Sequence, residues 1–187
     1  MLILMGLRGS GKSTVGRLVG AALNVPFADL DDRTAMTAVR KQLVPAGSSV
    51  AVVLQTLGEQ RFRRIEEEAL FEAVNKPACD IAVLALGGGT PTHPGSLAVI
   101  QARLNDTDRK TQLVYLRATP ATLAARLNAT DLSQRPSLTG RGVVEEIGEL
   151  FANRDPLYTS IATRIIDVDG LTPQQTASLI LRPPPCA

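Results

Sequence analysis

Residues 6–13, with the sequence GLRGSGKS, have a spacing that suits the binding of a phosphate chain. They match the pattern G-x-x-x-x-G-K-[ST], in which glycines let the backbone curl until several N–H groups converge on phosphate oxygens. In this pattern Lys12 reaches the β and γ phosphates of a nucleotide, and the Ser13 hydroxyl reaches Mg²⁺. The structural alternative is a glycine-rich turn that only caps a helix. Residues 2–5 are an apolar strand signal and residues 15–23 have apolar side chains at helical spacing, so this context favours nucleotide binding.

Two carboxylates, Asp29 and Asp31, follow a weaker strand signal at residues 26–29. Because the carboxyl ends of parallel strands meet at one edge of a sheet, we expect both side chains beside the phosphates. One carboxylate near Ser13 can hold hydrated Mg²⁺, and the other can accept the proton or hydrogen bond of an attacking hydroxyl. The alternative is that Asp31 or Asp32 only caps the helix that follows. Beside a phosphate-binding loop we favour the functional interpretation.

Three glycines, Gly87, Gly88 and Gly89, follow a strand signal at residues 81–86 and are expected at the same edge. Glycines permit a ligand to lie against bare backbone, with N–H groups as donors. A plain turn is the alternative.

Three arginines are candidates for holding an anionic group: Arg63, Arg135 and Arg154. A planar guanidinium binds a carboxylate or phosphate through two parallel hydrogen bonds. Each arginine also has a structural alternative. Arg63 can pair with the glutamates three and four residues further along a helix, Arg135 can be an exposed loop charge, and Arg154 can cap the end of a helix before Pro156. The pattern alone leaves these alternatives open.

The elements that must position these residues alternate between short apolar runs and segments of helical period, which is typical of a parallel sheet covered on both faces. The strand signals lie at residues 2–5, 26–29, 81–86, 112–116 and 164–168. A helix is predicted at residues 60–74, with a break before it at Gly58. Two more helices should begin at Thr119-Pro120 and Thr172-Pro173, where a hydroxyl N-cap precedes a proline.

Composition excludes several classes of protein. The 187 residues suit one domain, 44% are apolar, and the formal net charge is only +2. With four Phe, two Tyr, no Trp and no basic block, nucleic-acid binding is not favoured. No apolar run approaches a membrane span, and two cysteines, Cys79 and Cys186, indicate a reducing compartment. We therefore expect a cytoplasmic protein with a small-molecule partner.

Taken together, these residues resemble the shikimate kinase family, from Gly6 to about Pro173. The agreeing segments are residues 6–14, 29–31, 58–66, 87–89, 135–136 and 154–158. The phosphate-binding loop is generic, whereas Phe62-Arg63, the triple glycine and the sequence Arg-x-Pro-Leu-Tyr from Arg154 are specific in this order. The resemblance implies an α/β fold of P-loop NTPase type, a three-layer α/β/α sandwich with a five-stranded parallel sheet. It also implies a lid and a small substrate-binding excursion.

The resemblance further implies transfer of the γ-phosphoryl of ATP to the 3-hydroxyl of shikimate, on the route to chorismate, with Mg²⁺. We also expect a monomer. Catalysis then falls to Lys12, Asp31 and Arg135, the last of these from the lid. Metal binding falls to Ser13 and Asp29. ATP would be bound by Gly9, Ser10, Gly11, Lys12, Ser13, Thr14, Arg126 and Pro173, the last pair flanking the adenine. Shikimate would be bound by Asp31, Phe62, Arg63, Gly87, Gly88, Gly89 and Arg154.

The predicted organisation is one kinase domain over residues 1–182, with the excursion at about 32–62, the lid at about 128–142, and a disordered tail at 183–187. The chain departs from the family in its excursion, which is several residues longer than usual and has Val53-Leu54 in place of an isoleucine–phenylalanine pair. This departure concerns the acceptor more than the reaction. A kinase for another hydroxy acid such as gluconate is therefore one alternative, and a catalytically silent nucleotide-binding regulator is another.

Overall fold

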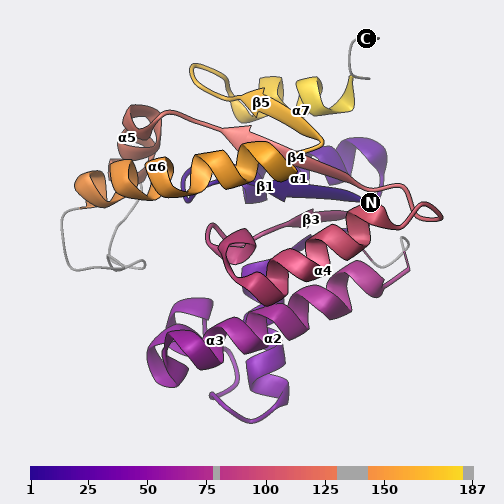
Figure 1. The fold of residues 1–187 in the computed structure, drawn as a ribbon, viewed down its shortest axis with the longest axis vertical. Coiled ribbons are helices and arrows are strands. Elements are labelled where there is room, and N and C mark those ends of the chain that lie inside the picture. The colour runs from indigo at the N-terminus through magenta and orange to yellow at the C-terminus, as the bar shows by residue number, and fades with distance from the viewer. Residues whose placement is uncertain (78–80, 130–142, 183–187) are drawn as a thin grey trace.

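A computed structural model describes residues 1–77, 81–129 and 143–182; for residues 143–145 it describes the backbone only. Five parallel strands form one sheet in the order β2-β3-β1-β4-β5 (Figure 1). The strands are β1 (Leu2–Met5), β2 (Phe27–Asp29), β3 (Val83–Ala85), β4 (Gln112–Arg117) and β5 (Arg164–Asp167). Each lies within or next to a strand signal of the sequence, so the predicted five-stranded parallel sheet is confirmed.

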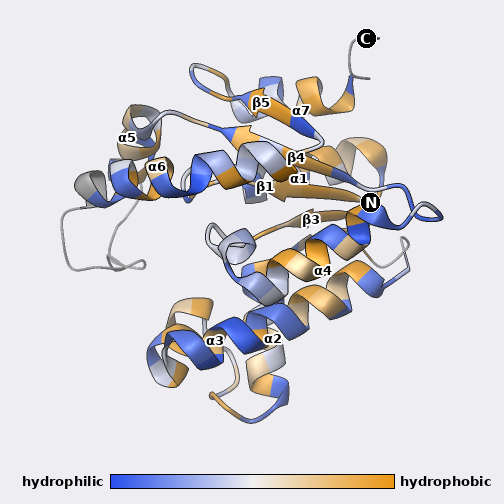
Figure 2. Ribbon diagram, viewed as in Figure 1, coloured by the Kyte–Doolittle hydropathy of each residue, from blue (hydrophilic) through white to orange (hydrophobic). Residues whose placement is uncertain are grey.

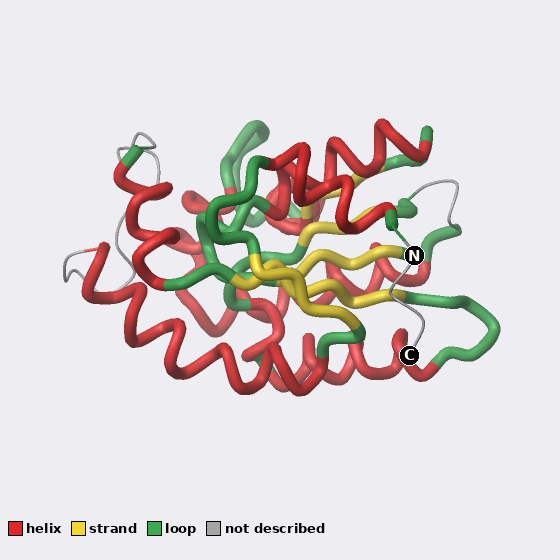
Figure 3. The backbone as a smooth tube through the Cα atoms, turned by 90° about the horizontal axis from the view of Figure 1, so that it is seen from above, coloured by secondary structure: helices red, strands yellow, loops and turns green. Residues whose placement is uncertain are grey.

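Helices lie on both sides of this sheet (Figure 3). Helix α1 packs against α7, α3 against α2 and α4, and α5 against α6. The helices are α1 (Lys12–Leu23), α2 (Leu30–Arg40), α3 (Val50–Asn75), η1 (Thr90–Thr92), α4 (Pro94–Asn105), α5 (Pro120–Asn128), α6 (Val143–Ile161) and α7 (Pro173–Leu181). The central strands are mostly hydrophobic (Figure 2), and residues such as Leu4, Leu84 and Leu113 are fully buried between the helix layers. In the part of the chain that the structure describes, no helix is long and apolar enough to cross a membrane.

Helix α3 contains the predicted break but begins ten residues before the predicted start. Gly58 has φ 72° and ψ 165°, a left-handed conformation that suits glycine and divides α3 into two helical parts. The first part carries three valines, which have low helix propensity, so sequence patterning did not indicate it. Its start is capped by Ser49, whose hydroxyl accepts from the N–H of Val52.

The first part of α3 packs with α2 around a small apolar cluster of its own, separate from the main core. Val53 is fully buried there, and Leu54 packs against the same cluster. These two residues thus fill a core position in the segment where the chain departs from its family. The buried members are Ala35, Ala38, Val44, Val53, Phe62 and Ile65.

The remaining helix signals have mixed outcomes. Thr119 and Thr172 both cap helices through their hydroxyls, as predicted. The alternative that Arg154 caps a helix ending before Pro156 is wrong, because α6 continues through Pro156 to Ile161. Side chains on both sides of the proline, those of Arg154, Asp155 and Tyr158, bond to other elements.

Candidate functional site

The phosphate-binding loop joins the end of β1 to the start of α1. Gly9 and Gly11 have φ 86° and 94°, so this turn needs residues without a side chain. The ammonium of Lys12 is buried and donates to the carbonyl oxygens of Gly6 at 2.9 Å and Leu7 at 3.0 Å. The lysine therefore lies folded over the loop. Among the described residues, the buried Ser10 hydroxyl has no hydrogen-bond partner, which suits a loop that receives phosphate oxygens.

Ser13 and Asp29 meet beside this loop. The Ser13 hydroxyl donates to Asp29 Oδ2 at 2.5 Å, while Asp29 Oδ1 accepts from the N–H of Asp31 at 3.0 Å. The N-cap of α2 is thus Asp29, and the alternative that Asp31 or Asp32 caps this helix is wrong. A hydroxyl and a carboxylate are the hard oxygen ligands that Mg²⁺ takes, and it usually adds waters and substrate phosphates. The pair fits a magnesium site, although no group of three or more His, Cys, Asp or Glu gathers in the described ranges.

Asp31 lies in the first turn of α2, next to the triple-glycine loop that follows β3. A Cβ placed on Gly87 would lie 3.0 Å from Asp31 Oδ1 and 2.9 Å from Glu66 Oε1. A side chain at this position would force these carboxylates to shift. The structure therefore brings Asp31 and the glycines together at the sheet edge that also carries the phosphate-binding loop, as expected for the carboxyl ends of parallel strands.

Arg63 reaches the same loop from α3. Its Nη1 donates to Glu66 Oε2 at 2.8 Å, and a Cβ on Gly89 would lie 2.8 Å from its Nη2. Glu66 is 2% exposed, and its second oxygen accepts from the Thr90 hydroxyl at 2.9 Å. The pairing proposed as the structural alternative for Arg63 thus exists, and it holds the guanidinium against the glycines. Glu66 was missed as part of the site, although a charged residue on the apolar face of a helix was a usable signal.

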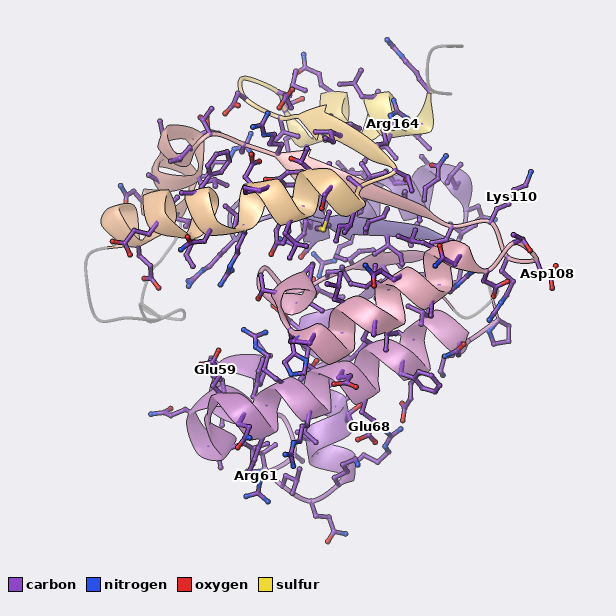
Figure 4. All side chains as sticks on the ribbon, viewed as in Figure 1. Glu59, Arg61, Glu68, Asp108, Lys110 and Arg164 are labelled. Carbon is purple, nitrogen blue, oxygen red and sulfur yellow. The ribbon has the colours of Figure 1, made fainter. Side chains whose placement is uncertain are left out.

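Phe62 precedes Arg63 and is buried in the small cluster of α2 and α3. The guanidinium of Arg63 lies 5.4 Å from the centre of the Phe62 ring. By contrast, Glu59 and Arg61 are exposed at the outer end of this unit (Figure 4). Phe62 therefore supports Arg63 from the side of the cluster, and Glu59 adds a longer ion pair with Arg63 at 3.9 Å from the solvent side.

Arg154 reaches the triple glycine from the opposite side, on α6. Its Nη1 donates to the carbonyl oxygen of Gly88 at 2.8 Å, and the Tyr158 hydroxyl donates to the same oxygen at 2.7 Å. Burial raises the pKa of Tyr158 to about 12, so this hydroxyl is protonated at neutral pH. Arg63 and Arg154, which are far apart in the sequence, thus flank adjacent glycines of one loop. Tyr158 is the tyrosine of the Arg-x-Pro-Leu-Tyr sequence, for which the sequence alone indicated no role.

The predicted adenine side lies between α5 and the start of α7. Arg126 Nη2 donates to the carbonyl oxygens of Val168 at 2.8 Å and Leu171 at 3.4 Å. This loop leads directly to Pro173, which is exposed at the first position of α7. The structure therefore brings Arg126 and Pro173 to one region. Arg135 and most of the predicted lid lie outside the described residues.

Three comparisons agree on the family. A sequence model described as shikimate kinase matches residues 8–183. The shikimate kinase of Rhodopirellula baltica is 35% identical over 98% of this chain and 90% of its own length, and shikimate kinase 2 of Syntrophotalea carbinolica is 38% identical over 89% and 86%.

Solved structures give the same result. The shikimate kinase of Acinetobacter baumannii, in complex with shikimate, matches with a TM-score of 0.79 and 28% identity, covering 96% of this chain and 89% of that one. The shikimate kinase of Bacteroides thetaiotaomicron matches with a TM-score of 0.75 and 27% identity, covering 96% and 94%. The chain therefore belongs to the shikimate kinase family.

Proposed function

We propose that this chain transfers the γ-phosphoryl group of ATP to the 3-hydroxyl of shikimate, giving shikimate 3-phosphate and ADP. One observation carries the proposal: Arg63 and Arg154 flank the triple-glycine loop, next to Asp31 and at the sheet edge that carries the phosphate-binding loop. Shikimate has one carboxylate and three hydroxyls. Two guanidinium groups can bind its carboxylate, and one aspartate can accept a hydrogen bond from a hydroxyl.

On the nucleotide side, Lys12 supplies positive charge to the transferred group, since phosphoryl transfer depends on positioning and charge stabilisation. Ser13 and Asp29 would hold Mg²⁺, which neutralises charge on the β and γ phosphates when it is bound. Arg135 is proposed to add a further positive charge from the lid, and Arg126 with Pro173 to flank the adenine.

On the acceptor side, Arg63 and Arg154 would hold the carboxylate and so fix the orientation of the ring. Asp31 would accept the hydrogen bond, or the proton, of the attacking hydroxyl. Its neighbour Gly87 lacks a side chain, so the acceptor can approach the backbone there. A reaction geometry fixed in this way accounts for phosphorylation of one hydroxyl among three.

The alternatives are less well supported. A gluconate kinase shares the need for a carboxylate-binding arginine pair, but the relatives described above are shikimate kinases. A silent regulator would not need Lys12, Asp31, Arg63 and Arg154 in their present arrangement. The longer excursion is the one observation that motivates another acceptor, and there Val53 is buried in the small apolar cluster.

The test is release of ADP from Mg-ATP in the presence of shikimate, quinate or gluconate, with ³¹P NMR to identify the phosphorylated oxygen. We expect shikimate alone to raise ADP release far above the rate with ATP only. Stimulation by gluconate but not shikimate would replace the proposed acceptor. No stimulation by any of the three would contradict a kinase of this class.

A further inference from the structure

Asp155, the residue after Arg154, is bonded through both carboxylate oxygens to side chains of β4. Arg117 donates from Nε to Oδ1 at 2.8 Å and from Nη2 to Oδ2 at 2.9 Å. The hydroxyl of Tyr115 donates to Oδ1 at 2.9 Å. A two-pronged guanidinium contact of this kind fixes direction as well as distance. The carboxylate therefore holds one turn of α6 at a defined place on the strand.

Aromatic packing extends this attachment along α6. The rings of Tyr115 and Tyr158 meet edge to face, with centroids 5.5 Å apart and an interplanar angle of 86°. Phe151, one turn before Asp155, lies with its ring centre 5.8 Å from the Arg117 guanidinium. Both tyrosines are almost completely buried. Burial and the nearby Asp155 carboxylate raise the pKa of Tyr115 far above its usual value, so its hydroxyl remains a donor.

Pro156 lies inside this part of α6, where a proline weakens a helix. A proline lacks the N–H that would donate to the carbonyl four residues before it, and its ring disturbs the preceding turn. The attachment at Asp155 is next to the proline. The two side chains that reach Gly88, those of Arg154 and Tyr158, lie on either side of it.

We infer that Arg117, Tyr115 and Asp155 are positioning residues for the acceptor. They fix α6 on β4, so that Arg154 and Tyr158 stay directed at the triple-glycine loop. The inference rests on the proposed function, because it names shikimate as the ligand whose binding depends on this attachment. None of the three residues needs to touch shikimate, and the nucleotide is held by other elements of the fold.

A purely structural ion pair makes a different prediction. The Arg117 side chain is 41% exposed, and an ion pair with a partner that is open to solvent contributes little to stability. If stability were the only role, removing the pair would lower the unfolding midpoint slightly and leave the kinetics unchanged. If the pair positions Arg154, its loss acts on the KM for shikimate in particular.

The experiment compares Asp155→Asn, Arg117→Gln and the double variant with the wild type. We expect each single variant to raise the KM for shikimate about 5- to 20-fold, with kcat and the KM for ATP changed less than about twofold. The KM for shikimate of the double variant should be no higher than that of the worse single variant, because both changes remove the same contact between Arg117 and Asp155. Arg117→Lys keeps the charge but not the fork, so its KM should lie between the wild type and Arg117→Gln.

The matched control is Arg109→Gln. Arg109 Nε donates to Asp106 Oδ2 at 2.8 Å, in the loop before β4. Its neighbours Asp108 and Lys110 lie at one edge of the molecule, on the side away from Glu59 and Arg61 of α3 (Figure 4). This loop enters the amino end of β4, whereas the phosphate-binding loop follows the carboxyl end of the parallel strand β1. We therefore expect Arg109→Gln to leave both KM values unchanged.

A second readout, amide hydrogen exchange in α6, does not depend on shikimate. Asp155→Asn should accelerate exchange around residues 154–158 and leave α1 as in the wild type. An unchanged KM for shikimate would overturn the inference, whatever the exchange rates, and so would an equal rise of both KM values. If the wild type itself did not use shikimate, the proposed function would fail, while faster exchange confined to α6 would still support the attachment.

Discussion

Lys12 of the phosphate-binding loop binds carbonyl groups close to it in the sequence, whereas Arg154 of the acceptor side binds a glycine far along the chain, and Arg63 pairs with a nearby Glu66 that in turn bonds a distant threonine. Lys12 donates to carbonyl groups five and six residues before it. Arg154 and Gly88 are 66 residues apart, and Glu66 and Thr90 are 24 apart. The phosphate-binding loop therefore depends on one strand–loop–helix unit, and the acceptor half on the packing of several elements. Substitutions should consequently separate into effects on phosphoryl transfer and effects on acceptor binding.

The largest effect should come from Lys12→Met. Loss of a preorganised charge at the transferred group should lower kcat about 10²- to 10³-fold, with little change in the KM for shikimate. Steady-state kinetics with both substrates varied will test this. Lys41→Met, which removes a surface pair with Glu68 at 2.7 Å, is the control and should behave as the wild type. A Lys12→Met enzyme with normal kcat would remove the lysine from the mechanism.

The next largest effect concerns the acceptor arginines. Arg63→Ala and Arg154→Ala should each raise the KM for shikimate about 10- to 150-fold, since a hydrogen bond to a charged group contributes about 1.5–3 kcal/mol. ATP affinity, measured by calorimetry, should stay the same. An equal loss of ATP affinity would indicate that the two halves are not separable.

The two arginines should differ in their effect on folding. Arg63→Ala leaves the Glu66 carboxylate, 2% exposed, without its charged partner, so it should also lower the free energy of unfolding by about 1–3 kcal/mol. Arg154→Ala leaves a Gly88 carbonyl that still accepts from Tyr158 and should cost less. Urea unfolding of both variants provides the measurement. The reverse order would contradict the role given to Glu66.

A pair of glycine substitutions tests how the nucleotide half is fixed on the sheet. A Cβ on Gly16 in α1 would overlap the ring of Phe27 in β2, so Gly16→Ala should destabilise the fold by about 1–3 kcal/mol. A Cβ on Gly148 in α6 meets nothing within 4 Å among the described residues, so Gly148→Ala should stabilise by about 0.5–1 kcal/mol. Thermal unfolding of the two will decide. A neutral Gly16→Ala would contradict the close approach of α1 to β2.

The smallest effect is a pH dependence. The pKa of Tyr158 is about 12 in the folded chain and close to 10 when unfolded, so the unfolded state loses its proton first as pH rises. The stability that this group contributes is complete below about pH 10 and is lost progressively toward pH 12. Tyr158→Phe should therefore flatten the fall in unfolding free energy over that range. An unchanged slope would contradict the burial of the neutral hydroxyl.

The difference between the halves also explains what the sequence could predict. The phosphate-binding loop, the five strands and the threonine caps depend on neighbouring residues, so local patterns indicated them. The start of α3 at Val50 did not follow from propensity, because its valines form a helix only through packing with α2. Glu66 with Thr90 and Asp155 with β4 join segments distant in sequence, and spacing within one segment does not reveal such contacts.

The central claim is that Arg63 and Arg154 hold the carboxylate of the acceptor. The most direct measurement is the ratio of kcat/KM for shikimate to that for its methyl ester, in the wild type and in Arg63→Ala and Arg154→Ala. We predict that the wild type favours shikimate by at least about tenfold and that the ratio falls toward one in each variant. A ratio that is equally large in the variants would show that other groups bind the carboxylate.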